Sequence, residues 1–127
     1  LRPNYGAPAV DNFPRQLADL VGYLGDGLEA EHPLARVKAS PRDVPRPDLW
    51  MLGSSDQGAA FAAYFGLAFS FAHFISEHNR PEVMNFYRSE FKPSARLDKP
   101  VASVAVSVIC ADTEEQARYL ASWDEGT

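Results

Sequence analysis

The first regular pattern of apolar positions along the chain is helical. Apolar residues recur at intervals of three and four, the spacing of one face of an amphipathic helix. The Asp11-Asn12 pair can cap the free N–H groups of a first turn, and Pro14 is tolerated there. Gly25 and Gly27 interrupt the pattern, so the sequence predicts a helix that ends before them. Its apolar stripe consists of Phe13, Leu17, Leu20, Val21 and Leu24.

Residues 1–10 and 26–48 carry no such periodicity. The first segment contains two prolines and a glycine, and it is predicted to be a loop. The second contains four prolines and many charged residues. A connection of this length is typical of a functional or disordered loop. Residues 1–48 are therefore predicted to be one helix followed by a proline-rich connection.

The pattern changes at residue 49, where short, nearly continuous apolar runs begin to alternate with amphipathic segments. Such runs are typical of parallel strands that are covered by helices, with right-handed crossovers. Residues 49–127 therefore predict three β-α units in an α/β fold. The alternation alone does not decide between a doubly wound sheet and part of a barrel. The predicted order is strand 49–53, helix 56–65, strand 69–75, helix 81–91, strand 101–111 and a last helix that starts at 112–115.

Each predicted helix has candidate packing residues. Small side chains in the helix over 56–65 favour close packing against the sheet, and Gly66 is expected to end that helix. In the last helix, Asp112 is expected to cap the first turn while Glu115 reaches back to it. The strand 101–111 is rich in Val and Ile, so Cys110 is expected to be an inert core residue. The inward-facing residues are predicted to be Ala59, Ala60, Ala62, Ala63, Val83, Phe86, Tyr87, Phe91, Ala117, Leu120 and Ala121.

Composition narrows the class of protein. The chain has 127 residues, of which 46% are hydrophobic and 23% are charged, as in an average globular domain. We therefore treat residues 1–127 as a single domain. The 12 basic and 17 acidic residues give a net charge of -5. No basic cluster offers affinity for phosphate backbones, so we expect no nucleic-acid partner.

The cysteine count and the length of the apolar runs indicate where in the cell the protein is expected. A lone cysteine excludes an intramolecular disulfide and a cysteine-based zinc site. No run approaches the ~18 apolar residues of a membrane-spanning helix. The first ten residues do not resemble a signal peptide, although the chain begins with Leu rather than Met. We therefore expect a soluble, cytoplasmic protein with no membrane association.

The stretch over residues 52–58 is the most informative for chemistry. It connects the end of a strand to the start of a helix, where backbone N–H groups are free and the helix dipole favours an anion. Ser54 and Ser55 add two hydroxyl donors, whereas Asp56 would repel a phosphate unless it points away. The pattern is neither a Walker A loop nor a GxGxxG fingerprint. From spacing alone, a phosphate site and a plain serine-capped turn both remain open.

Other polar residues carry weaker signals. His73 lies near the end of an apolar strand, where catalytic residues of parallel sheets gather, but a half-buried structural histidine fits equally well. His78 follows without a third ligand at suitable spacing, so we predict no metal site. No GxSxG elbow supports Ser-His-Asp catalysis, and the pattern assigns no catalytic residue. Three further cations could assist an anion, although such residues are more often solvated: Arg88, Lys92 and Arg96.

Taken together, the motifs of the chain resemble those of the bacterial luciferase-like, flavin-dependent monooxygenases. The matching stretches lie in order along nearly the whole chain, and their combination is more specific than any one of them. The stretches are residues 11–14 (DNFP), 49–55 (LWMLGSS), 62–67 (AAYFGL), 71–74 (FAHF), 87–94 (YRSEFKPS) and 111–117 (ADTEEQA).

The resemblance implies part of a (β/α)8 barrel that binds FMN. Members of this family use reduced FMN and molecular oxygen to oxidise an organic substrate. The family resemblance implies that the turn at Ser54 and Ser55 holds the FMN phosphate, with Gln57 and Gly58 beside it. It also places His73 at the end of the next strand, facing the flavin pocket. A flavin reductase is a partner that such an enzyme could use.

The chain also departs from the family pattern. A barrel of this type typically needs ~250 residues, so the chain corresponds to the middle of one. Ala68 stands where the family usually has proline, and the loop over 76–80 lacks a close counterpart. Exposed strand edges of a partial barrel would favour self-association, so we expect a homo-oligomer. Two alternatives to the enzyme remain: a non-catalytic relative that binds flavin or a nucleotide phosphate weakly, and a self-associating structural fragment.

Overall fold

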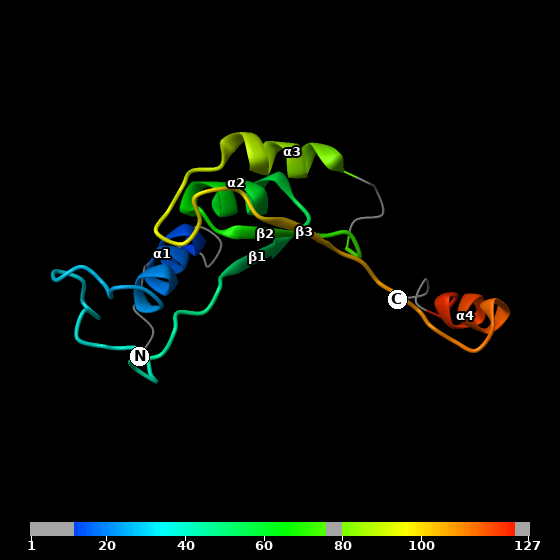
Figure 1. The fold of residues 1–127 in the computed structure, drawn as a ribbon, viewed down its shortest axis with the longest axis horizontal. Helices are drawn as coiled ribbons and strands as arrows, with labels where there is room; N and C mark the ends of the chain where they lie inside the picture. Colours follow the sequence, from blue (N-terminus) through cyan, green and yellow to red (C-terminus); the bar gives the residue numbers. More distant parts are fainter. Residues whose placement is uncertain (1–11, 76–79, 124–127) are drawn as a thin grey trace.

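The computed structural model describes residues 12–75 and 80–123 (Figure 1). The expected elements occur in the expected order, as an α/β arrangement with a parallel sheet. The predictions for residues 1–10, Asp11, His78 and most of the 76–80 loop lie outside the described residues. The elements are α1 (Phe13–Tyr23), β1 (Trp50–Gly53), α2 (Asp56–Phe65), β2 (Ala68–Ala72), α3 (Pro81–Glu90), β3 (Ala102–Ala105) and α4 (Glu114–Ala121).

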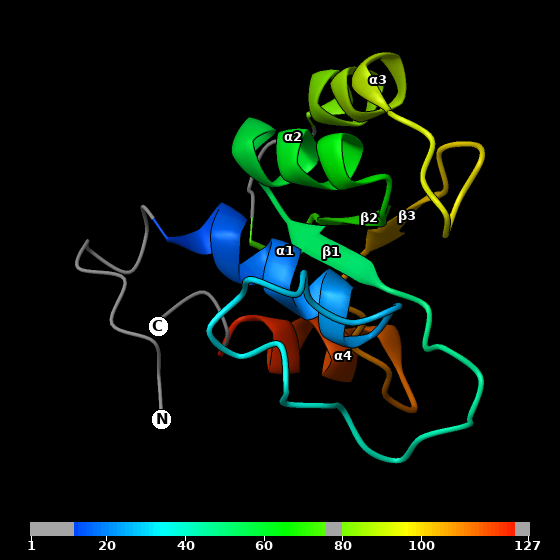
Figure 2. The ribbon, with the colours of Figure 1, turned by 90° about the vertical axis from the view of Figure 1, so that its left-hand side faces the viewer.

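The three strands form one parallel sheet in the order β1-β2-β3. The register pairs Gly53 with Phe71 and Phe71 with Val104, so the carboxyl ends of the strands share one edge of the sheet. Helices α2 and α3 cover one face of this sheet, and α1 lies beside β1 (Figure 2). The other face exposes Leu52 and Trp50, because side chains alternate along a strand.

The core lies between the sheet and helices α2 and α3. Alanines on α2 let the helix approach β2 closely, as predicted, whereas Phe86 is 39% exposed and does not face inward. Of the stripe along α1, only Leu17 is buried. The core cluster consists of Ala59, Ala62, Ala63, Phe69, Phe71, Val83 and Tyr87.

Gly66 ends α2 for a steric reason. Its backbone is left-handed, with φ of 60°, which glycine adopts without strain. A Cβ at this position would lie 2.5 Å from the Cβ of Ser94 and 2.6 Å from the carbonyl oxygen of Lys92. The segment after α3 therefore packs directly on the end of α2, and only glycine fits between them.

Tyr87 connects α3 to the starts of two strands. Its hydroxyl lies 2.8 Å from the carbonyl oxygen of Leu67 and 3.0 Å from that of Val101, and it accepts a hydrogen bond from the N–H of Val101 at 3.1 Å. Burial raises the pKa of the Tyr87 phenol above 10.0, although the bond to Val101 and the charge of Arg88 act in the opposite direction. The phenol thus connects backbone groups of Leu67 and Val101, and the Val101 carbonyl also accepts from the N–H of Phe69 at 3.0 Å.

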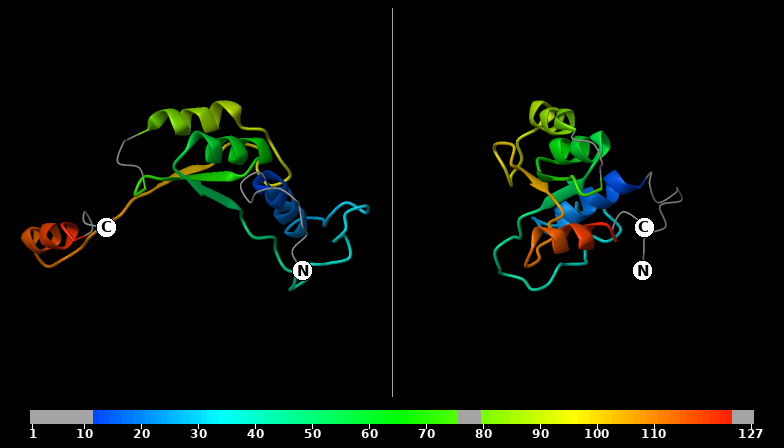
Figure 3. Two further views of the ribbon diagram at one scale, coloured as in Figure 1. Left: turned by 180° about the vertical axis from the view of Figure 1, so that it is seen from behind. Right: turned by 90° about the vertical axis from the view of Figure 1, so that its right-hand side faces the viewer.

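The predicted third strand is too long. Residues 101–111 form a strand only over Ala102–Ala105, and Cys110 is exposed rather than part of the core. The chain then runs away from the sheet to α4, which has no buried residue (Figures 1 and 3). The predicted inward face of that helix is therefore wrong. Apolar composition alone did not specify burial here, because β3 pairs with β2 on only one side among the described residues.

Three smaller boundary predictions also differ. The cap of α4 is Thr113, not Asp112, because the Thr113 hydroxyl accepts from the N–H of Gln116 at 3.2 Å. The strand predicted over 69–75 ends at Ala72 and is followed by a turn. Asn12 occupies the cap position of α1, but its side chain makes no capping bond, because its backbone is already helical.

Candidate functional site

The turn between β1 and α2 has the geometry of a serine-capped helix start. Ser55 is extended, with φ of -121° and ψ of 160°, and α2 begins at the next residue. Its Oγ accepts a hydrogen bond from the N–H of Gly58 at 3.4 Å. Since the oxygen acts as an acceptor in this bond, the hydroxyl proton remains available for a ligand. Of the two interpretations that the sequence left open, the structure therefore shows the serine cap, and the phosphate site stays a prediction.

This turn can hold an anion through its backbone. The N–H groups of Asp56 and Gln57 belong to the first turn of α2, where no helical carbonyl precedes them. The positive end of the helix dipole adds to their effect. Ser55, Asp56 and Gln57 are exposed, so a ligand from solvent can reach them.

The two glycines near the turn lie where α2 meets β1. The Cα atoms of Gly53 and Gly58 face each other, and a Cβ on either would lie 3.7 Å from the other residue's Cα. Such a distance is ordinary van der Waals contact. A side chain at Gly58 would point toward β1 and the ring of Phe69, which lies 3.9 Å away. A Cβ therefore fits at either position, and the contact between α2 and β1 does not itself require glycine.

Asp56 would oppose an anion at this turn, but its carboxylate is paired. The Nη2 of Arg80 donates to Oδ2 of Asp56 at 3.2 Å. Arg80 is the cap residue of α3, so the pair joins the starts of the two helices. The local sequence pattern does not indicate this role for Arg80, because the two partners are 24 positions apart. The available signal was a basic residue immediately before a helix-starting proline.

A pocket of about 400 Å³ lies beside the turn. It brings together three of the candidate residues, namely Ser55, Gln57 and Gly58. Ser54 adjoins this pocket along the chain but is not among its lining residues. The remaining lining residues are Phe13, Met51, Leu52, Gly53 and Phe61.

His73 lies at the same edge of the sheet, but over the next strand. It is the first residue after β2 and is exposed. Its backbone N–H donates to the carbonyl oxygen of Ala105 at 3.0 Å, which ties the turn to β3. Its ring packs edge-on against that of Phe71, with 6.4 Å between centroids. The structure therefore places His73 near the carboxyl edge without bringing it into the pocket of Ser55.

The other cations considered have different roles. Arg96 donates to the carbonyl oxygens of Leu24 at 2.7 Å and Pro47 at 3.0 Å, so it fastens both ends of the long loop before β1. Lys92 lies 4.5 Å from the centre of the Tyr64 ring in a cation–π contact. Arg88 is exposed in the last turn of α3. Neither Arg96 nor Lys92 is available to assist an anion at the turn.

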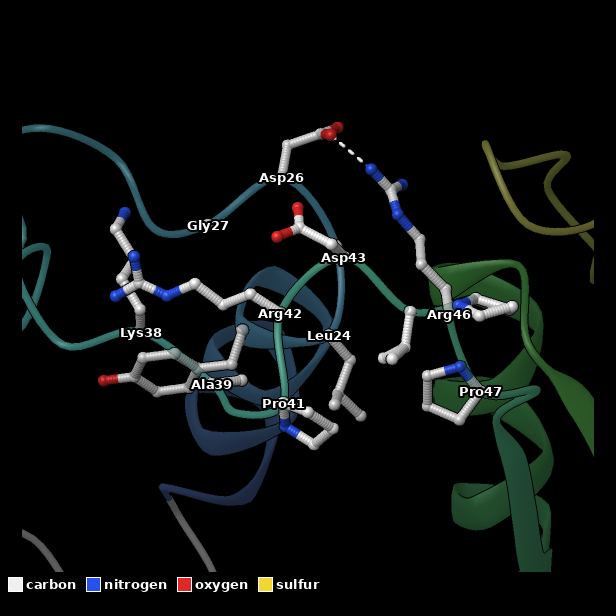
Figure 4. Close-up of a pocket in the computed structure, with 14 residues that line it drawn as sticks. Leu24, Asp26, Gly27, Lys38, Ala39, Pro41, Arg42, Asp43, Arg46 and Pro47 are labelled. Carbon is white, nitrogen blue, oxygen red and sulfur yellow. Dashed lines mark hydrogen bonds and ion pairs between the residues drawn. The ribbon is translucent and has the colours of Figure 1, made fainter.

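A second pocket, of about 350 Å³, is formed by the loop before β1 (Figure 4). It contains none of the candidate residues, and its loop leads into the amino end of β1 rather than the carboxyl end. Asp26 and Arg46 form an ion pair at this pocket, drawn as a dashed line in Figure 4. Lys38 and Arg42 also line it. The geometry thus separates this pocket from the Ser55 turn.

Residues 12–75 and 80–123 bear on two further features, a metal site and a membrane-spanning helix. No group of three or more His, Cys, Asp or Glu side chains in these ranges is placed to hold a metal ion. None of the helices described there is both long and apolar enough to cross a membrane.

Comparison with known proteins gives a consistent result. Residues 17–125 match the sequence profile of the luciferase-like monooxygenase family. The chain is 41% identical over 115 residues to the uncharacterized protein YwcH of Bacillus subtilis, covering 91% of this chain and 34% of that protein. It is 40% identical over 111 residues to a luciferase-like monooxygenase of Escherichia coli, covering 87% and 32%.

A solved structure has the same fold. The crystal structure of apo-MsnO8 superposes with a TM-score of 0.71 at 35% identity, over 88% of this chain and 32% of that one. A more distant relative, at 28% identity over 92% of this chain and 34% of its own length, is the N-acetyl-S-alkylcysteine monooxygenase of Bacillus subtilis. The chain thus spans about a third of the length of the relatives it matches.

Proposed function

The chain belongs to the luciferase-like monooxygenase family, and we propose that it supplies the cofactor-phosphate turn of an FMN-dependent monooxygenase. Its parallel β-α units are part of the (β/α)8 barrel of that family. The single observation that carries the proposal is the Ser55-capped start of α2 at the carboxyl edge of the sheet. Ligands of parallel α/β folds bind at this edge.

The residues present fit a phosphate dianion. The hydroxyls of Ser54 and Ser55 would donate to its oxygens, and the free N–H groups at the start of α2, including that of Gln57, would do the same. Gly58 holds the Ser55 side chain in place through the capping bond. His73, at the end of the neighbouring strand, contacts the flavin ring or the substrate. The ion pair between Asp56 and Arg80 reduces the negative charge that would oppose the phosphate.

Reduced FMN, when bound, supplies the electrons with which molecular oxygen oxidises an organic substrate. The part of these residues in that reaction is to bind and orient. A phosphate held at the turn would fix one end of the cofactor at the carboxyl edge of the sheet, the edge at which His73 also lies. A flavin reductase is the proposed source of reduced cofactor, and a homo-oligomer is the proposed assembly. The substrate class proposed is an organic small molecule.

The test is a fluorescence titration of the native polypeptide that carries these residues, with FMN and with riboflavin, which lacks the phosphate. The proposal expects saturable FMN binding that is tighter than riboflavin binding. Ser55→Ala should weaken FMN binding by about 1.5–3 kcal/mol, roughly 10- to 150-fold, because a bond to a charged group is lost. Riboflavin binding should not change.

Thr113→Ala is the matched control, because Thr113 caps α4 with the same geometry at a distance from the turn. It should leave FMN binding unchanged. Equal affinities for FMN and riboflavin in the unaltered protein would contradict the phosphate site. The absence of any saturable binding would favour the structural alternative, and binding without oxygen-dependent turnover would favour the non-catalytic one.

A further inference from the structure

We propose that Arg80 determines the preference of the Ser55 turn for a phosphorylated ligand by neutralising Asp56. The inference rests on the function proposed above and concerns the charge of the same turn. Asp56 is the first residue of α2, so its carboxylate lies at the end of the helix where an anionic ligand would bind. Without compensation, it would repel a phosphate at close range.

The negative charge of Asp56 is compensated by one ion pair, with Arg80. Arg80 reaches from the start of α3 and donates to Oδ2 of Asp56 at 3.2 Å. This contact brings the pair to zero net charge and draws the carboxylate toward α3. The N–H groups at the start of α2 keep their positive character, since backbone dipoles do not depend on the pair.

The pair is too exposed to be explained by stability. The side chains of Arg80 and Asp56 are 41% and 62% exposed, and ion pairs of this kind contribute little to folding. Asp56 alone is favourable at a helix start, so α2 does not need Arg80. The partner becomes important when a second negative charge arrives at the turn. Arg80 is therefore a positioning residue that acts through Asp56.

The experiment compares FMN and riboflavin binding to four forms of the native polypeptide: unaltered, Arg80→Ala, Asp56→Asn and the double variant. Arg80→Ala should weaken FMN binding about tenfold, the scale of one partly exposed charge contact, and leave riboflavin binding unchanged. Asp56→Asn should bind FMN at least as tightly as the unaltered protein. The double variant should regain the unaltered affinity to within about twofold, because Arg80 then has no charge to neutralise.

Arg88→Ala is the matched control, because it removes an exposed arginine from the opposite end of α3. It should change neither affinity. Circular dichroism of each variant excludes loss of fold as the cause of a change.

Two outcomes would overturn the inference. One is an Arg80→Ala variant that binds FMN as the unaltered protein does. The other is a tenfold loss that persists in the double variant, since this would mean that Arg80 acts on the ligand directly or on the fold. A failure of the proposed function would differ from both, because the unaltered protein itself would then bind FMN no better than riboflavin.

Discussion

The unit β2-α3 is packed, whereas the unit β3-α4 is open, although each starts with an apolar strand. In β2, Phe69 and Phe71 are 0% and 2% exposed. In β3, Val104 is 52% exposed, and the apolar residues that follow lie outside any strand. Helix α3 buries Val83 and Tyr87 against the sheet, while α4 buries nothing.

This difference shows that an apolar strand is buried only when its neighbours are present. Strand β2 lies between two strands and under two helices, whereas β3 has a single strand neighbour among the described residues. In an eight-stranded barrel every strand has two neighbours. The apolar residues over 104–109 therefore fit a strand that has neighbours on both sides, as in a complete barrel. The chain spans about a third of the length of the relatives it matches.

The candidate site lies on the packed side of this comparison. The Ser55 turn starts a helix that is anchored on β1 and β2 by buried alanines, and Gly66 holds its other end. A turn held in this way is preorganised, which reduces the entropic cost of binding a ligand.

The largest predicted contrast is between Phe69 of β2, which is buried in the core, and Val104 of β3, which is half exposed. Phe69→Ala should lower the free energy of unfolding by about 3–5 kcal/mol, because it leaves a cavity in the core. Val104→Ala in the 127-residue chain should cost about 0.5 kcal/mol or less, since its side chain is half exposed. Denaturant titration measures both, and similar losses would contradict the comparison.

A smaller effect is predicted for Tyr87, whose hydroxyl lies within hydrogen-bond distance of three backbone groups. Tyr87→Phe should lower the free energy of unfolding by about 1–3 kcal/mol, because the Leu67 carbonyl and the N–H of Val101 lose their hydrogen bonds to the phenol. Tyr64→Phe is the control, as that ring is 63% exposed. The prediction fails if both variants unfold at the same denaturant concentration.

Removing the cap of α2 should affect stability more than removing the cap of α4. Ser55→Ala should lower the free energy of unfolding by about 1 kcal/mol, because α2 is part of the core. Thr113→Ala should reduce helix content while leaving the unfolding midpoint of the 127-residue chain unchanged, because α4 is not packed. Circular dichroism with denaturant titration separates these results, and a shifted midpoint for Thr113→Ala would show that α4 contacts the core.

The smallest effect is a dependence of stability on pH. Since the folded-state pKa of Tyr87 is raised above 10.0, unfolding exposes a phenol that ionises more readily. Its contribution to stability is complete below pH 10 and decreases as the pH rises above that value. The difference between the unaltered protein and Tyr87→Phe should therefore shrink at high pH. A constant difference from pH 8 to 11 would contradict the raised pKa.

Local signals predicted α2 well. The limits of α2 were correct because its cap and its terminal glycine, Ser55 and Gly66, act within a few residues. The turn at Ser54 and Ser55 was recognised for the same reason. By contrast, the length of β3 depends on neighbouring strands, which the local pattern over 101–111 does not encode.

The Asp56–Arg80 pair could not be predicted, because the fold brings together residues far apart in sequence. The same holds for Arg96. The sequence suggested a solvated side chain, but Arg96 donates to two carbonyl groups that are distant along the chain. Placing His73 required the end of β2, which came earlier than the apolar run suggested. Long-range polar contacts and strand ends were thus the parts that needed the structure.

The most direct test of the proposed phosphate turn is amide NMR of the native polypeptide during an FMN titration. The amide signals of Asp56, Gln57 and Gly58 should shift when FMN binds, and riboflavin should shift them much less. The signals of residues 38–46, around the second pocket, should stay in place. Shifts confined to residues 38–46, or equal shifts with riboflavin, would contradict the phosphate site at Ser55.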